Sequence, residues 1–373
     1  GAWANVARFV MRRPWMTMLT TLAVLITLML PAFSAEFSQV DDRVLPKTNP
    51  AAVSSQVLRD EFSSNESTPI EVLLPVIRDA DSLSISDYAL QASSIDHIVR
   101  VEAPQGIAID GQWVPMQPGM PWPTSTMEAN GFIRMRMFVD LGSRTPAALD
   151  VITQLRELDA SALVGGGSAD YTDSQNGVAN ALPPALLWIA ITTLIILFLY
   201  TGSLLLPIKA VLLNVLSLGA TLGVLTWMFE DGNLRWLTGD YTVTGTLDTS
   251  TLVIIAVVTF GLSMDYEVFL LSRIKEEHES GRDTQEAVAL GLQRSGRIIT
   301  AAALLLAVVF AAFVTSGVTS IKMMGFGIAF AILLDASVVR GLLVPSLMRI
   351  AGKYNWWAPK PLRVIYERFG LKD

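Results

Sequence analysis

Four ionisable side chains interrupt two otherwise apolar stretches of the chain. Asp265 and Glu267 stand in GLSMDYEVFLLSR, and Asp335 and Arg340 stand in LLDASVVRGLLVP. An ionisable residue near the centre of a membrane-spanning helix costs at least ~2.5 kcal/mol, so such residues mark ion paths, proton relays or structural ion pairs. No histidine lies in an apolar stretch of the sequence, so carboxylates would have to carry any transported proton.

Asp265 is the residue best suited to proton transfer. Burial disfavours the charged form of a carboxyl group, and a neighbouring base or hydroxyl opposes that effect. Tyr266 supplies a hydroxyl directly next to it in sequence. A carboxyl group balanced in this way can bind a proton from one side of a membrane and release it to the other. A structural ion pair that holds helices together is the alternative for both Asp265 and Asp335.

Helical spacing predicts how the four charges are oriented. Asp265 and Glu267 would point roughly 200° apart, and Asp335 and Arg340 roughly 140° apart, so neither pair is well placed to interact within its own α-helix. A rise of 1.5 Å per residue places Asp265 about 12 Å and Arg340 about 13 Å from the same membrane edge. We therefore expect Arg340 to pair with a carboxylate on a neighbouring helix. Glu267, about 9 Å deep, is expected to reach toward the membrane surface. Asp335, Arg340 and Glu267 are thus predicted supporting membrane charges.

The composition indicates a membrane protein. Of 373 residues, 51% are hydrophobic and only 16% are charged, whereas an average soluble domain has roughly 25% charged residues. Six stretches reach the ~20 apolar residues that a spanning helix needs; they cover residues 15–33, 182–200, 207–229, 247–271, 298–316 and 323–348. Six buried helices in a soluble core of this size would leave too little polar surface. The predicted fold class is a polytopic α-helical membrane protein with six transmembrane helices in a 1 + 5 arrangement.

The distribution of charge predicts the orientation. With the N-terminus inside, the inner segments carry 15 basic and seven acidic residues, and the outer segments carry 11 basic and 24 acidic ones. Basic residues favour the cytoplasmic side, so both termini are predicted to be cytoplasmic, in the inner membrane. The predicted domains are a first helix with a cytoplasmic start at 1–33, an exterior domain at 34–181, a five-helix bundle at 182–348 and a cytoplasmic segment at 349–373.

Residues 34–181 are predicted to form an exterior α/β domain. Strand-like runs cover 70–76, 97–101 and 132–139, and helical spacing covers 51–62 and 146–158. A stretch rich in Pro and Gly, 104–130, holds the two tryptophans and three methionines that suit an adaptable apolar surface: Trp113, Trp122, Met116, Met120 and Met127. The two tryptophans are therefore candidate substrate-facing residues, with a long connecting loop as the alternative.

Several function classes are excluded or disfavoured. The chain has no cysteine and only two histidines, which excludes a disulfide, a thiolate nucleophile, a thiolate zinc site and a His-rich metal site. No cofactor is expected apart from protons as the coupling ion. The net charge of −7 is the sum of basic inner segments, acidic outer segments and the membrane charges, so by itself it says little about partners; no nucleic-acid partner is expected. An intramembrane enzyme would need paired groups such as two facing aspartates, and the sequence around Asp265 and Asp335 shows no protease-type motif.

Longer motifs resemble a known family. Four segments carry the resemblance: GLSMDYEVFLLSRIKEE, ALGLQRSGRIITAAAL, FGIAFAILLDASVVRGLLVPSLM and NWWAPKP. Together with the opening MRRPWMTML and the later FSQVDDRVLP, they resemble the MmpL family of the RND (resistance-nodulation-division) transporter superfamily. The resemblance covers essentially the whole chain, and the DYE form and the WWAP ending are similar to the C-terminal half of such a transporter.

The resemblance implies a function as well as a fold. It implies export of lipids or other hydrophobic compounds driven by the proton-motive force, with the family's Asp-Tyr proton relay at Asp265 and Tyr266. It implies a porter-like exterior domain and, as partners, membrane lipids, adaptor proteins and an N-terminal half in the same or a separate chain. That half would supply a second Asp-Tyr pair. A protein-translocation accessory and a sterol-sensing-type membrane protein of the same superfamily are the alternatives.

Overall fold

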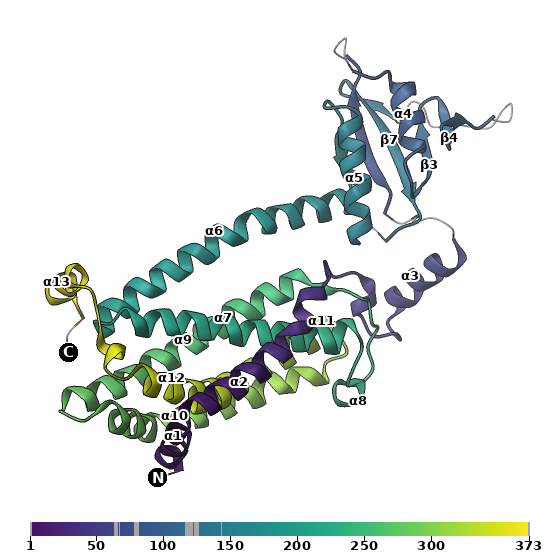
Figure 1. Ribbon diagram of the computed structural model, residues 1–373. Coiled ribbons are helices and arrows are strands. Elements are labelled where there is room, and N and C mark those ends of the chain that lie inside the picture. The colour runs from purple at the N-terminus through teal and green to yellow at the C-terminus, as the bar shows by residue number, and fades with distance from the viewer. Residues whose placement is uncertain are drawn as a thin grey trace. The chain divides into compact units, whose positions relative to one another are not determined.

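The computed structural model describes residues 2–62, 66, 68–77, 82–115, 122, 127–142 and 144–371. The chain divides into two compact units, one formed by Gly1–Glu36 with Pro183–Asp373 and the other by Phe37–Leu182. We call them the membrane unit and the α/β unit (Figure 1). Each has a hydrophobic core of its own.

Within the described residues, six helical segments are long and apolar enough to cross a membrane. They are Pro14–Ser34, Gly167–Thr201, Leu205–Glu230, Thr249–Glu279, Thr284–Thr315 and Thr319–Trp356. A region that contains a mixed set of strands and helices lies in sequence between the first segment and the other five. Both findings confirm the predicted fold class, and the chain is a multi-pass membrane protein.

The membrane unit is built mainly from long helices. In chain order they are α1 (Ala2–Arg12), α2 (Pro14–Met29), α7 (Leu205–Leu225), α8 (Arg235–Thr238), α9 (Thr249–Glu279), α10 (Thr284–Ala312), α11 (Thr319–Leu334), α12 (Val344–Ala351) and α13 (Lys360–Phe369). A further helix, α6, comprises Gly167–Thr201. Its first turns are polar, so the helix begins well before residue 182, where the apolar part of its sequence starts. Helix α9 packs against α7, α10 and α11, and α2 packs against α7.

Helix α7 can approach α2 closely because it presents two glycines. Gly219 and Gly223 are four residues apart, so they lie on one face of the helix. A Cβ atom at Gly223 would overlap the backbone of Leu28, and one at Gly219 would overlap the side chain of Met29. Small residues at this spacing let helices pack backbone to backbone in a membrane, where the hydrophobic effect does little to drive helices together.

Helix α11 does not continue as a regular α-helix. Residues Asp335–Leu343 form a π-helix, η6, and a shorter π-helix, η4 (Thr226–Glu230), follows α7. In a π-helix the backbone hydrogen bonds join residue i to residue i+5 instead of i+4. Such helices are rare overall, and those that occur often lie at functional sites. In η6 this change of pitch brings residues five apart onto one face.

The α/β unit contains an antiparallel sheet. Its strands are β2 (Ile70–Pro75), β3 (Ile98–Ala103), β4 (Gly106–Ile109), β5 (Gln112–Trp113), β6 (Glu128–Ala129), β7 (Phe132–Val139) and β8 (Leu163–Gly165). The order is β5-β4-β3-β7-β2-β8, and β6 pairs with β7. The unit's helices are α3 (Pro50–Glu61), α4 (Ile85–Ser93) and α5 (Pro146–Leu158). A short strand, β1 (Phe37–Ser38), also belongs to this unit, whereas the short strand β9 (Leu247–Asp248) belongs to the membrane unit.

One face of the sheet forms the core of the α/β unit. Alternate residues of β2 and β7 are buried, as expected for a sheet with one covered face. Helices α4 and α5 contribute buried residues to the same core. The hydroxyl of Tyr88 in α4 donates to the carbonyl oxygen of Leu155 in α5 at 2.8 Å, so the one polar group of this large side chain is satisfied.

Candidate functional site

Asp335 and Arg340 form a buried ion pair inside the membrane unit. Arg340 donates from Nη2 at 2.7 Å and from Nε at 2.9 Å to Oδ2 of Asp335. The expectation that Arg340 pairs with a carboxylate on a neighbouring helix is therefore wrong. The estimated angle of 140° assumed α-helical pitch, whereas η6 is a π-helix, in which two residues five apart share a face.

Ser263 joins this ion pair to helix α9. Its hydroxyl donates to Oδ2 of Asp335 at 3.0 Å, and Nη2 of Arg340 contacts both the Ser263 hydroxyl, at 3.3 Å, and its carbonyl oxygen. The network therefore connects η6 with α9 by hydrogen bonds between buried groups. Sequence reasoning missed Ser263, although a serine two residues before Asp265 in an apolar stretch was a usable signal.

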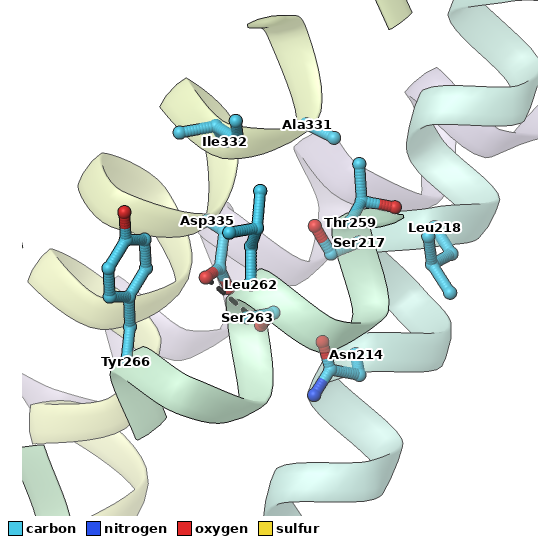
Figure 2. A pocket seen from close by; sticks show the side chains of 10 residues that line it. All are labelled: Asn214, Ser217, Leu218, Thr259, Leu262, Ser263, Tyr266, Ala331, Ile332 and Asp335. Carbon is cyan, nitrogen blue, oxygen red and sulfur yellow. Dashed lines mark hydrogen bonds between the residues drawn. The ribbon is translucent and has the colours of Figure 1, made fainter. Parts of the chain in front are cut away.

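Tyr266 lies next to the ion pair and lines a small hollow. The guanidinium carbon of Arg340 is 5.3 Å from the centre of the Tyr266 ring, within the range of a cation–π interaction. Figure 2 shows the hollow between α7, α9 and α11, with Asp335 between Tyr266 and Thr259 and hydrogen-bonded to Ser263. Its lining residues are Asn214, Ser217, Leu218, Thr259, Leu262, Ser263, Tyr266, Ala331, Ile332 and Asp335. The lining thus brings hydroxyl, amide and carboxylate groups together at one place between the spanning helices.

Asp265 occupies a different place from Asp335. Asp265 is exposed on the surface of α9, and in the part of the chain that the structure describes it makes no hydrogen bond or ion pair. Gly261, one turn earlier on the same face, has open space where a Cβ atom would be, and Val257 is exposed too. The structure therefore does not bring Asp265 and Asp335 together as paired catalytic aspartates. It places an ionisable side chain on an outward face of a spanning helix, where charge is costly unless something covers it.

Glu267 and Lys209 are a second set of buried charges. Glu267 of α9 is 4% exposed and Lys209 of α7 is 8% exposed, and the charge of Glu267 acts on Lys209. Among the described residues, neither Oε1 of Glu267 nor Nζ of Lys209 has a hydrogen-bond partner. The expectation that Glu267 reaches toward the membrane surface is wrong, because its side of α9 is packed inside the unit. Lys209 was missed as a candidate because it follows the start of an apolar stretch and resembled a loop residue.

The two candidate tryptophans lie in the α/β unit. Trp113 belongs to β5 and packs against the core of that unit. Trp122 donates from its indole nitrogen to the carbonyl oxygen of Ala103 at 2.8 Å. Met116 and Met120 lie outside the described residues. The assignment of both tryptophans as substrate-facing stays a prediction.

Comparison with known proteins identifies the family. Residues 142–368 match the model of the MMPL family. The chain belongs to the MmpL family. This confirms the membership in the RND transporter superfamily that the motifs predict.

Several curated relatives of this MmpL chain are known. It is 36% identical over 382 residues to the trehalose monomycolate exporter MmpL3 of Mycobacterium tuberculosis, a match that covers 100% of this chain and 39% of the relative. It is 29% identical to the heme uptake protein MmpL11 of the same organism, over 96% of this chain and 36% of the relative. A membrane protein of Streptomyces coelicolor is 45% identical over 61% of this chain and 32% of its own length. The MmpL chain thus spans about two fifths, or less, of the length of these relatives.

Proposed function

We propose that this chain is one half of a proton-driven RND-type exporter of lipids or other hydrophobic compounds. The observation that carries the proposal is the polar network of Asp335, Arg340 and Ser263, buried between spanning helices beside Tyr266. Ionisable groups inside a membrane are retained for ion paths and relays because their insertion is costly. The relative named as a trehalose monomycolate exporter supports a lipid as the substrate class.

Asp265 and Tyr266 form the proposed proton relay. Protonation of Asp265 removes a negative charge from the outward face of α9, while Tyr266, the next residue, lies beside Arg340. Because Ser263 bonds α9 to Asp335 and Arg340, a shift of α9 is transmitted to η6. One charge that crosses a potential of 100 mV supplies ~2.3 kcal/mol for such a movement. No cofactor is required, since protons are the coupling ion.

The exposed face around Asp265 is the proposed contact for the other half of the transporter. Gly261 and Val257 are small, apolar residues of this face. Asp265 lies within the membrane-spanning part of α9, so its carboxyl group requires a polar partner from another part of the transporter. An N-terminal half, in the same or a separate chain, would supply that cover and a second Asp-Tyr pair. The α/β unit would form part of the substrate passage, with Trp113 and Trp122 facing the substrate. Adaptor proteins are further proposed partners.

The substitution Asp265→Asn tests the relay. The amide keeps the size of the side chain and removes the proton-binding group, so we expect the transporter to fold and to lose both export and proton uptake. The assay is proton-gradient-driven transport of a labelled glycolipid in vesicles that contain the complete transporter. Glu279→Gln, an exposed carboxylate on the same helix, is the matched control and is expected to leave transport unchanged. Normal transport by Asp265→Asn would refute the relay, and loss of folding would indicate a structural role.

A further inference from the structure

Helix α13 is amphipathic and only partly covered by the rest of the protein. It comprises ten residues, Lys360–Phe369, and none of them is buried. At about 100° per residue, four apolar side chains fall within a sector of roughly 100°: Leu362, Ile365, Tyr366 and Phe369. Val364, which is 63% exposed, is apolar too but lies outside this sector. Ile365 is 43% exposed and Phe369 is 61% exposed. The basic residues lie outside this sector: Lys360, Arg363 and Arg368.

Tyr366 fixes the position of α13 relative to the spanning helices. Its hydroxyl accepts a hydrogen bond from Nζ of Lys275 in α9 at 3.1 Å, and Lys275 also donates to the carbonyl oxygen of Tyr200 in α6 at 3.0 Å. The ring of Tyr366 packs edge-on against Phe198, with centroids 6.3 Å apart. Since α6 ends at Thr201, α13 lies at the level where the spanning helices leave the hydrocarbon region.

The surroundings of α13 have the composition of a membrane–water interface. Tyr354 and Trp357 precede the helix and are exposed, and Lys353 lies beside them. Aromatic and basic residues concentrate at this depth of a bilayer. Helix α13 contains three basic residues and one acidic residue, Glu367, so its net charge is positive. An amphipathic helix with a basic polar face and exposed apolar side chains is typical of a helix that lies in the plane of the interface.

We propose that α13 binds the membrane surface as an anionic-lipid anchor. Ile365 and Phe369 insert among the acyl chains, and Lys360, Arg363 and Arg368 bind phosphate oxygens of anionic phospholipids. The positive charge of α13 and the negative charge of the headgroups favour a lipid surface over a protein partner. The end of α6 at Thr201 places α13 at the depth where such headgroups lie. Because Lys275 bonds Tyr366, the anchor holds the end of α9, the helix that carries Asp265.

Spin labels test this placement directly in the complete chain. The chain has no cysteine, so a nitroxide attached at Ile365→Cys, Phe369→Cys or Glu367→Cys reports one position. In vesicles of phosphatidylcholine with 30% phosphatidylglycerol, we expect labels at 365 and 369 to collide with oxygen several-fold more, relative to a water-soluble nickel chelate, than the label at 367. Equal access of the nickel chelate to all three positions would overturn the proposal.

Lipid charge provides the second arm of the experiment. In phosphatidylcholine alone, or with Arg363→Gln and Arg368→Gln together, we expect the labels at 365 and 369 to lose at least half of their protection from the nickel chelate. Arg134→Gln, an exposed arginine of the α/β unit, is the matched control and should change nothing. Protection independent of lipid charge would exclude binding to anionic headgroups. Protection that appears only after a cell extract is added would show that a protein covers the helix.

Discussion

Asp335 is the only acidic residue that pairs with Arg340 in the described part of the chain. Removing one member of a buried ion pair leaves the other charge uncompensated, which costs about 3–5 kcal/mol. We therefore expect Asp335→Asn to destabilise the membrane unit by about that amount, measured as a large fall in unfolding temperature in detergent. Ser337→Ala, at an exposed position of the same π-helix, is the control. Equal stability of the two variants would show that the pair contributes little.

We also expect Lys209 and Glu267 to depend on each other. Neither Lys209 Nζ nor Glu267 Oε1 has a hydrogen-bond partner in the described structure, and the opposite charge of Glu267 acts on Lys209 across the contact of α7 and α9. We expect Lys209→Met and Glu267→Gln each to be damaging and the double variant to be less damaging than their sum, with a coupling of about 0.5–3 kcal/mol. A double-mutant cycle by thermal unfolding measures this value.

The pair Lys275 and Glu279 offers a comparison for that cycle. Its members are 3.7 Å apart and four residues apart on α9, with Glu279 exposed and Lys275 half-buried, and helical pairs at this spacing contribute about 0.3–0.5 kcal/mol. A coupling for Lys209 and Glu267 no larger than this would mean that the buried charges act independently. Since Lys275 also bonds Tyr366, Glu279 is the residue to vary in the comparison.

At the scale of single elements, the chain shows which features a sequence predicts well. Apolar length alone predicts the six spans, and alternation predicts β7, because both patterns are local consequences of what the element faces. Helix α4 was missed although Ser84 caps it by accepting from the backbone nitrogen of Asp87, a local start signal. The π-helix η6 could not be predicted, because its surroundings come from elements far away in sequence: it packs against α2 and is hydrogen-bonded to Ser263 of α9.

The close approach of α7 and α2 makes a prediction at this scale. A Cβ atom at Gly223 would overlap the backbone of Leu28, which has no flexible end to move aside. We therefore expect Gly223→Ala to destabilise the protein by at least the 1–3 kcal/mol typical of an overpacked interface. Gly261→Ala on α9 is the control, because nothing lies within 4 Å of its added Cβ atom. Unfolding in detergent measures both, and a tolerated Gly223→Ala would contradict the backbone contact.

At the scale of the whole molecule, the prediction concerns the side of the membrane on which each connecting segment lies. The basic excess of one set of connecting segments predicts the sidedness of the chain through the preference of Lys and Arg for the cytoplasmic face. Because the chain has no cysteine, a thiol introduced at one position reports the side of the membrane on which that position lies.

Two single cysteines determine the sidedness. Asp96→Cys places a thiol on an exposed position of the α/β unit, and Glu279→Cys places one on the exposed end of α9. With basic segments inside, a membrane-impermeant maleimide added to intact cells should label position 96 and reach position 279 only after the membrane is permeabilised. The cysteine-free parent measures background labelling. Labelling of position 279 in intact cells, with position 96 protected, would reverse the proposed topology and place the α/β unit in the cytoplasm, where it could not line an export passage.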